Sequence, residues 1–275
     1  MLEQPEAITL AKQLNENVTG RSVVKVCPPT KPHKFCWYNG EPDTYDKAVS
    51  DCKITGADGF GIFVELSFDN GMKLCINDGV NLRLITNDKV PKNYQLLIML
   101  DDGQALVFTV AMYGGIYLHD GSYDNKYYLA SKNAVTSFSS EFTDYFHRLI
   151  TESKPNLSAK AFLATEQRFS GIGNGTLQDI LFTARIHPKR KISTLSENEK
   201  DNLLNSVMTV LKEMTDLGGR DTEKDLFGVS GRYKTLMSKN TVGADCPKCG
   251  NEIVKENYLG GSVYYCPQCQ PDIKK

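Results

Sequence analysis

The sequence predicts an α+β protein with an N-terminal helix and a two-sheet antiparallel β-sandwich, then a helical domain, then a C-terminal β-hairpin held by cysteines. Three observations support this prediction. Strand-like runs fill residues 22–129, helical periodicity takes over after Ser137, and the last thirty residues carry two Cys-x-x-Cys pairs. We therefore expect domains over residues 1–136, 137–240 and 241–275.

A first helix is predicted over residues 5–17. Pro5 suits a first helical turn, where its missing N–H is not required. Ile8, Ala11 and Leu14 recur at the spacing of one helical face. This helix therefore offers an apolar side to the rest of the fold.

The region that follows is typical of an antiparallel sandwich or barrel. Turn signals of the Asp-x-Gly type begin at Asp69 and at Asp101, between short apolar or alternating runs. The clearest of these runs cover residues 61–68, 72–76, 95–100 and 105–110. Their length and spacing favour strands joined by tight hairpins.

Three helices are predicted after residue 137. The first covers Ser158 to Arg168, and the second covers Thr176 to Ala184. The third starts at a capping box, Ser196-Glu197-Asn198-Glu199, and ends at Gly218-Gly219. The pattern indicates a helical domain without internal repeats.

A glycine-rich turn separates the first two of these helices. Gly171, Gly173 and Gly175 should leave several backbone N–H groups free near one point, and Asn174 adds a side-chain donor. Backbone donors at the start of a helix bind phosphate oxygens, helped by the helix dipole. A plain interhelical turn needs the same glycines, so both interpretations stay open.

Four cysteines near the C-terminus have the spacing of a structural metal site. Two knuckles separated by sixteen residues place four thiolates around one tetrahedral ion, which predicts one structural zinc. Predicted strands at 253–255 and 263–265, with a bend at Gly260-Gly261, complete a zinc-finger hairpin. Two disulfides are the alternative. The expected ligands are Cys246, Cys249, Cys266 and Cys269.

Composition suits a protein of the reducing cytoplasm. No apolar run is long enough to span a membrane, and the N-terminus lacks a signal-peptide pattern. Four further cysteines show no pairing pattern, and we interpret them as small buried hydrophobic residues. They are Cys27, Cys36, Cys52 and Cys75.

The charge is unevenly distributed along the chain. Residues 1–150 carry 14 Lys and Arg against 18 Asp and Glu, whereas residues 151–275 carry 18 against 15. The densest basic cluster, residues 187–191, is either a solvated loop or a contact for a phosphate backbone. Charge alone is compatible with a nucleic-acid partner for the second half of the chain.

In order and spacing, these motifs resemble those of the formamidopyrimidine-DNA glycosylase and endonuclease VIII family of base-excision repair enzymes. The resemblance spans almost the whole chain, although the strands between the motifs match only loosely. The matching segments are Glu3-x-Pro5-Glu6, the run from Ala161 to Asn174, Ile180-Leu181-Phe182, Ile186-His187-Pro188, Gly218-Gly219 and the closing cysteine pairs that end at Gln270.

The resemblance implies a fold and a partner. An N-terminal helix leads into a two-sheet β-sandwich, and a helix-two-turn-helix domain over residues 137–240 grips damaged double-stranded DNA together with the zinc finger. It also implies a monomeric, bacterial-type protein that is associated with the nucleoid in the cytoplasm.

The resemblance further implies roles for the first three residues. Family members lose the initiator methionine and attack C1′ of the damaged nucleotide with the amine of an N-terminal proline, beside a glutamate that carries protons for the sugar. Glu3 matches that glutamate, but Leu2 stands at the proline position and should leave Met1 in place. Either the Met1 amine still reaches C1′ and preserves an abasic-site lyase, or Glu3 activates a water, which gives a glycosylase without efficient strand cleavage.

Five more positions are implied in DNA binding. Asn174 matches a phosphate-binding asparagine, with Gly173 before it in the same turn. Lys160 and Arg168 flank this motif on the predicted helix. Tyr113 stands at the position of an aromatic wedge that enters the DNA.

Three positions depart from the family pattern. The segment with a phosphate-contacting lysine reads Gly59-Phe60-Gly61, and Gly261 replaces an arginine at the hairpin tip. The segment with a void-filling methionine reads Asn77-Asp78-Gly79-Val80. Loss of two cations should weaken DNA binding and lower its salt dependence by about one charge each.

Two functions of different class follow. The leading one is a glycosylase that flips a damaged, oxidised base out of duplex DNA and excises it, with weak or absent lyase activity. The alternative is a catalytically inactive protein of the same fold that binds lesions or abasic sites. The retained Glu3 favours the enzyme, and the altered catalytic positions favour the binder. A zinc-stabilised protein-interaction module would leave the turn at Gly171–Asn174 unexplained.

Overall fold

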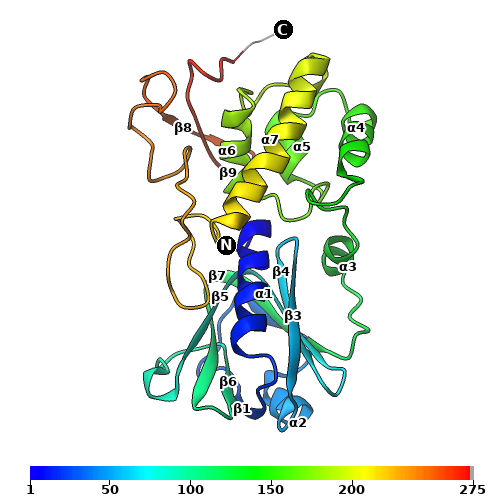
Figure 1. The fold of residues 1–275 in the computed structure, drawn as a ribbon, viewed down its shortest axis with the longest axis vertical. Coiled ribbons are helices and arrows are strands. Elements are labelled where there is room, and N and C mark those ends of the chain that lie inside the picture. The colour runs from blue at the N-terminus through cyan, green and yellow to red at the C-terminus, as the bar shows by residue number, and fades with distance from the viewer. Residues whose placement is uncertain (273–275) are drawn as a thin grey trace.

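The computed structural model describes residues 1–272, and its elements follow the predicted order (Figure 1). A β-sheet forms one end of the molecule, and the helices after residue 140 form the other end with the finger hairpin. The N-terminus lies at the middle, where the two ends meet (Figure 1). No helix within residues 1–272 is long and apolar enough to cross a membrane.

The first helix, α1 (Gln4–Asn17), begins with the capping box that its sequence allows. The Glu3 backbone N–H donates to the Glu6 carboxylate, and Pro5 sits in the first turn. Leu10 and Leu14 are buried against the sheet, mainly against β3 (Ile54–Phe60). The amphipathic pattern thus fixes α1 on the sheet with its first residues at the domain junction.

Seven strands form one hydrogen-bonded sheet, six of them in the order β1-β6-β7-β5-β4-β3, and β2 pairs with residues 114–116 of β7. All pairs are antiparallel except β2 with β7. Gly71 and Gly103 lie in the predicted turns with φ of 85° and 80°, which favours glycine. The strands besides β3 are β1 (Val23–Cys27), β2 (Cys36–Tyr38), β4 (Phe63–Phe68), β5 (Lys73–Thr86), β6 (Leu96–Leu100) and β7 (Gln104–His119).

The two layers predicted for the sandwich are joined through two long strands. β5 has 14 residues and β7 has 16, and each runs through both layers. The register of this pair shifts between Asp78 and Val80, which is a β-bulge. A Cβ on Gly79 would lie 2.5 Å from the Tyr113 carbonyl oxygen, so the bulge requires glycine there. The bulge sits at the bend that faces the domain junction.

The helical domain contains α4 (Phe142–Glu152), α5 (Ala159–Ala164), α6 (Thr176–Thr183) and α7 (Glu197–Asp216). Its core is the cluster around Phe146, Phe162 and Phe169, whose rings pack edge to face or tilted. Short elements that the sequence did not predict are η1 (Pro42–Thr44), α2 (Tyr45–Val49), η2 (Asn87–Lys89), α3 (Lys126–Lys132) and η3 (Ile192–Thr194).

The predicted helix from Ser158 to Arg168 is shorter than expected. α5 ends at Ala164, because Glu166 and Gln167 adopt φ of 59° and 54° in the left-handed region. Arg168 therefore lies in the turn, where its guanidinium donates to the Ala161 and Thr165 carbonyls. The placement of Arg168 on the same helix as Lys160 was wrong.

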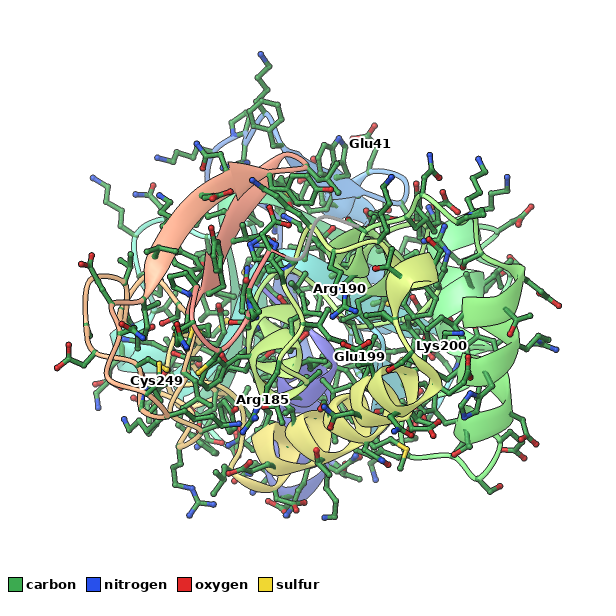
Figure 2. The ribbon with its side chains drawn as sticks, turned by 90° about the horizontal axis from the view of Figure 1, so that it is seen from above. Glu41, Arg185, Arg190, Glu199, Lys200 and Cys249 are labelled. Atoms are coloured by element: carbon green, nitrogen blue, oxygen red, sulfur yellow. The ribbon has the colours of Figure 1, made fainter. Side chains whose placement is uncertain are left out.

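Two residues of the basic cluster at residues 187–191 form ion pairs within the protein. Arg190 pairs with Glu199 of the α7 capping box at 2.6 and 2.9 Å (Figure 2). Lys189 pairs with Glu256 of strand β8 (Val254–Tyr258), which forms the finger hairpin with β9 (Gly261–Tyr265). This structural use of the cluster favours internal packing over a phosphate contact.

A buried ion cluster connects the two ends of the molecule. Arg220 follows the glycines that end α7, and its guanidinium donates to Glu6 at 2.8 and 3.0 Å and to Glu3 at 3.3 Å. All three side chains are nearly inaccessible to solvent. Burial alone would raise the pKa of Glu3, but Arg220 and the N–H groups of Thr176 and Gly175 outweigh it and lower that pKa.

We predict that Arg220→Met lowers the free energy of unfolding at neutral pH by about 3–5 kcal/mol, because two buried carboxylates lose their partner. Urea denaturation measures this loss. Arg21→Met removes an exposed pair with Asp102 and serves as the matched control, with an expected change below about 0.5 kcal/mol. Equal losses in the two variants would contradict the role of the cluster.

The same variant should change the pH dependence of stability. The folded-state pKa of Glu3 lies below its unfolded value, so its contribution is complete above the unfolded pKa and is lost as the pH falls through the folded one. Without Arg220, burial raises the pKa of Glu3, and protonation then removes the free-energy cost of an unpaired buried charge. The difference in the free energy of unfolding between wild type and Arg220→Met should therefore become smaller as the pH falls from neutral to about 4.

Candidate active site at the domain junction

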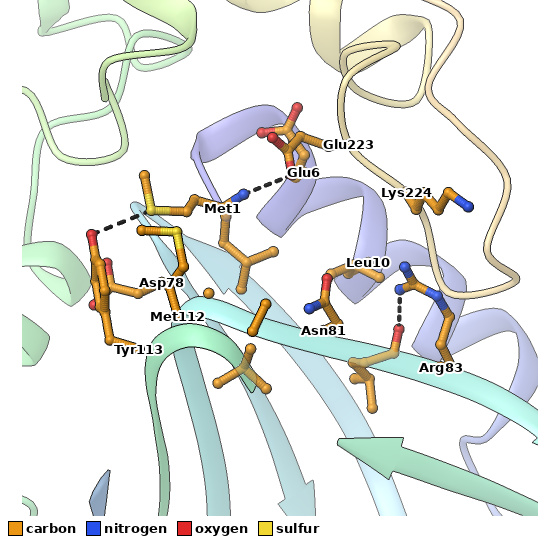
Figure 3. A pocket seen from close by; sticks show the side chains of 15 residues that line it. Met1, Glu6, Leu10, Asp78, Asn81, Arg83, Met112, Tyr113, Glu223 and Lys224 are labelled. Carbon is orange, nitrogen blue, oxygen red and sulfur yellow. Dashed lines mark hydrogen bonds and ion pairs between the residues drawn. The ribbon is translucent and has the colours of Figure 1, made fainter. Parts of the chain in front are cut away.

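A cavity of about 180 Å³ opens where α1, the β5–β7 bulge and the loop after α7 meet (Figure 3). Met1 and Leu2 line the cavity together with Asp78 and Tyr113, which contact them directly. Glu223 of the loop after α7 closes a further side. Of the N-terminal residues predicted for the site, the cavity thus brings together Met1 and Leu2 but not Glu3, with Asp78 and Glu223 from two other segments.

Met1 is held in this cavity by three contacts. Its terminal ammonium pairs with a Glu223 carboxylate oxygen at 2.6 Å, and its carbonyl accepts from Arg220 at 3.3 Å. Its sulfur accepts a hydrogen bond from the Tyr113 hydroxyl at 3.3 Å (Figure 3). The amine, the carbonyl and the sulfur of Met1 thus each have a partner in the structure.

Leu2 occupies the position that the resemblance assigns to the nucleophile. Its side chain is 8% exposed and belongs to the core of the sandwich. Its backbone N–H donates to the Asp78 carbonyl at 2.8 Å. Residue 78 on the bulge is therefore the direct neighbour of the nitrogen at position 2.

Glu3 is buried at the N-terminus of α6 and is not among the residues that line the cavity. Its carboxylate accepts from the N–H groups of Gly173, Gly175 and Thr176 at 3.1, 2.8 and 2.8 Å. The helix dipole and these donors favour a negative charge at this point. With Arg220 as a further donor, Glu3 is an ionised and fully bonded carboxylate.

The glycine-rich turn therefore differs from the expectation of several free N–H groups. The Gly173 and Gly175 donors are used by Glu3. The backbone N–H of Asn174 has no acceptor within residues 1–272, and its side-chain amide donates to the Ser262 carbonyl of the finger at 3.0 Å. Asn174 is half-buried between α6 and the hairpin, and its side-chain oxygen is buried without a hydrogen-bond donor in residues 1–272.

Lys160 reaches the same place from α5. Its ammonium donates to the Tyr258 carbonyl of the hairpin at 2.6 Å, and burial lowers its pKa. A Cβ on Gly261 would lie 3.2 Å from the side-chain Oδ1 of Asn174 and 3.4 Å from the Lys160 ammonium. Lys160 therefore places a positive charge beside the hairpin position where the family pattern has an arginine.

The four cysteine sulfurs of the finger all lie within 4.8 Å of one another. Sγ···Sγ distances are 3.9 Å for Cys246 and Cys269 and 3.4 Å for Cys249 and Cys266. A tetrahedron with metal–sulfur bonds of about 2.3 Å has edges of about 3.8 Å, so the arrangement fits a four-thiolate metal site. The hairpin packs on α6 through Phe182, which shares a small core with Cys246 and Cys266.

Sequence reasoning missed three residues of the site. Arg220 had a signal, since it directly follows the matched Gly218-Gly219 pair. Asp78 lies in a segment that departs from the family pattern, and that departure was its only signal. Glu223 had no local signal, because its role arises from a contact with residue 1.

Comparison with known proteins is consistent with this geometry. Residues 134–225 match the family model described as the formamidopyrimidine-DNA glycosylase H2TH domain. A formamidopyrimidine-DNA glycosylase of Heliobacterium modesticaldum is 28% identical over 289 residues, which cover 98% of this chain and 100% of the relative. One of Prochlorococcus marinus is 36% identical over 138 residues, 48% of this chain and 46% of the relative.

Solved structures show the same fold. A Lactococcus lactis Fpg in complex with abasic-site DNA superposes with a TM-score of 0.85 at 21% identity, over 98% of this chain and 100% of that one. A complex of the Lactococcus lactis Fpg with DNA that contains Fapy-dG gives a TM-score of 0.83 at 21% identity, with the same coverage. Residues 134–225 therefore match the H2TH domain model, and the whole chain is similar in sequence and in fold to formamidopyrimidine-DNA glycosylases, with leucine at position 2.

Proposed function

We propose that this protein is a DNA glycosylase of base-excision repair, which flips an oxidised base out of duplex DNA and cleaves its N-glycosidic bond. The observation that carries the proposal is the cavity at the domain junction, which brings Met1, Leu2 and Tyr113 together, with the buried Glu3 next in the chain. A stacked base hides its C1′–N bond, so a cavity for a flipped nucleotide is required for this chemistry. Relatives named formamidopyrimidine-DNA glycosylase over the full chain support the same conclusion.

The catalytic role of Glu3 is to present negative charge beneath the sugar. Glycosidic cleavage builds positive charge on the sugar ring, and a fixed carboxylate stabilises that charge. The four donors around Glu3 keep it ionised and hold it in place. This arrangement suits an electrostatic role better than the proton-carrier role of a free carboxylate.

The Met1 amine is the expected nucleophile for any lyase step. It is paired with Glu223, and an ammonium ion has no lone pair with which to attack C1′. The protein should therefore release bases with little strand cleavage. Nucleophile placement tolerates little error, and the amine lies one residue upstream of the family position.

The DNA-binding surface combines the turn, α5 and the finger. Asn174 offers a backbone N–H that has no acceptor in residues 1–272 and a side-chain amide at the hairpin, where Lys160 supplies a cation. Gly173 and Arg168 shape the turn through backbone contacts. Tyr113 lies at the cavity mouth, where an aromatic ring can fill the space of a flipped base. The partner is damaged double-stranded DNA, bound by a monomer at the nucleoid of a bacterial-type cytoplasm.

The finger is proposed to hold one structural zinc. Four thiolates leave no open coordination position, so the metal supports the hairpin that contacts Asn174 and Lys160. The ion supplies folding free energy and no catalytic step.

The wild-type protein should release an oxidised purine from duplex DNA, retain Met1 by intact mass, and trap weakly with borohydride on abasic-site DNA. Leu2→Pro should permit methionine removal and expose a secondary amine that can still donate to the Asp78 carbonyl. We expect a tenfold or larger rise in borohydride trapping for this variant.

Leu2→Ala is the matched control, because it also permits methionine removal but leaves a primary amine. It should trap less than Leu2→Pro. The enzyme proposal fails if wild type releases no oxidised or alkylated base while it still binds lesion duplexes. Protein of that kind would be a lesion binder of the same fold.

Elemental analysis of protein purified without chelator should give one zinc per chain. Cys266→Ser should lose the metal, loosen the hairpin and weaken DNA binding, while the sheet stays folded because its core is separate. Cys52→Ser, in the sandwich, is the matched control and should keep the zinc. Metal-free wild-type protein with full DNA affinity would rule out this assignment.

Asn174→Ala should weaken binding of every duplex by tenfold or more, because it removes a donor to a phosphate, an effect of about 1–3 kcal/mol. Fluorescence anisotropy at fixed salt concentration measures the change. Asn133→Ala, after α3, is the control and should leave affinity unchanged. Unaltered binding by Asn174→Ala would remove this residue from the DNA surface.

A further inference from the structure

We propose that Asp78 is the general base of the glycosylase reaction, which activates a water molecule for attack on C1′ in place of the family's N-terminal amine. This inference rests on the proposed function and assigns its central chemical step. The carrying observation is that both groups expected from the sequence, the Met1 amine and Glu3, already have ionic or hydrogen-bond partners. The Asp78 carboxylate, which also lines the cavity, has no such partner within residues 1–272.

The engaged groups have little capacity to deprotonate a water. Glu3 accepts four hydrogen bonds, three of them from the backbone at the start of α6. Its depressed pKa makes it a weak base. The Met1 ammonium lies 2.6 Å from Glu223, so each of these two groups neutralises the other.

Asp78 is placed in the cavity by a specific backbone feature. It sits on the β-bulge of β5 with φ of 53°, a conformation that is uncommon for residues other than glycine, asparagine and aspartate. Bulges re-aim side chains and occur often beside active sites. The bulge directs Asp78 to the cavity wall that also contains Met1 and Tyr113 (Figure 3).

The position of Asp78 relative to residue 2 is equally specific. Its carbonyl accepts the Leu2 N–H at 2.8 Å, so Asp78 borders the nitrogen that would be the nucleophile if residue 2 were an N-terminal proline. A water held by the Asp78 carboxylate would lie on the side of the sugar from which that amine attacks. The substitution of leucine for proline and the acid on the bulge thus complement each other chemically.

The carboxylate of Asp78 is chemically available. It takes part in no hydrogen bond or ion pair with a side chain or backbone donor within residues 1–272. Burial raises its pKa, and the N-terminal ammonium partly opposes that rise. A carboxylate whose pKa is raised by burial is a stronger base than an ordinary aspartate.

The reaction is balanced without any further reactant. A water oxygen forms a bond to C1′ while its proton moves to Asp78, and the C1′–N bond breaks with its electron pair on the departing base. The proton on Asp78 then returns to solvent or to the released base. No Schiff base forms, which accounts for base release without strand cleavage.

The titration of Asp78 depends on the charged and titratable groups that surround the cavity. They are the Met1 amine, Glu6, Arg83, Tyr113, Tyr117, Glu223 and Lys224. Burial and the charge of Asp78 together raise the pKa of Tyr113, so that phenol stays neutral over the range in which a carboxyl titrates. The fall in the rate of base release at low pH (the acid limb of the pH profile) therefore reports on protonation of the carboxyl at position 78.

The test measures single-turnover base release from an oxidised-purine duplex by wild type, Asp78→Asn and Asp58→Asn. Asparagine tolerates positive φ as well as aspartate does, so the bulge should persist. Asp58 lies on β3 and is exposed, which makes it the matched control. We expect Asp78→Asn to slow release at least a hundredfold, with affinity for a stable abasic analogue within about threefold of wild type.

A pH profile separates catalysis from structure. Wild-type release should rise with pH through an acid limb that is missing in Asp78→Asn, whereas a structural defect would lower the whole curve without changing its shape. Release by Asp78→Asn within threefold of wild type would overturn the assignment, as would stoichiometric borohydride trapping of wild type at Met1. Wild type that releases no base overturns the glycosylase proposal itself, so the two failures are distinguishable.

Discussion

The buried Arg220 is the interaction on which the arrangement of this molecule depends. Its guanidinium bonds Glu3 and Glu6 of α1 and the carbonyl of Met1, while its own backbone continues from the end of α7. A charge buried between two domains is tolerated only with all its partners in place. The cluster therefore fixes the N-terminus, α1 and the helical domain relative to one another, and the cavity exists because they are fixed.

The same constraint decides which groups are free for chemistry. A carboxylate that must neutralise Arg220 and cap α6 has no remaining lone pairs for a water. A terminal ammonium that pairs with Glu223 is likewise occupied. The bulge residue Asp78 lies outside the cluster, and its carboxylate faces the cavity without a partner in residues 1–272. The cavity thus contains both Leu2, in place of the family's N-terminal proline, and the carboxylate of Asp78.

The finger and the glycine-rich turn act as one surface. Asn174 and Gln178 both donate to the Ser262 carbonyl, and Lys160 donates to the Tyr258 carbonyl, so the hairpin is positioned by α5 and α6. Gly261 leaves room beside Asn174, and Lys160 places a cation there. Loss of the arginine from the hairpin therefore leaves the site with a positive charge, although one with point-charge geometry in place of a bidentate fork.

Short-range spacing was enough to predict strands followed by helices, the four-cysteine cluster and the capping box of α7, because each of these features depends on residues close together in the chain. Local patterns also led to one wrong assignment: helix propensity continued to Arg168, whereas left-handed residues at 166 and 167 end α5 at Ala164. The partners of the charged groups follow from the packing of segments that are far apart in the chain. The partners of Glu3 are at least 170 positions away in the chain, and Glu223 meets Met1 across 222 positions. Ionic pairs of this kind depend on how the domains pack, which no local sequence pattern specifies.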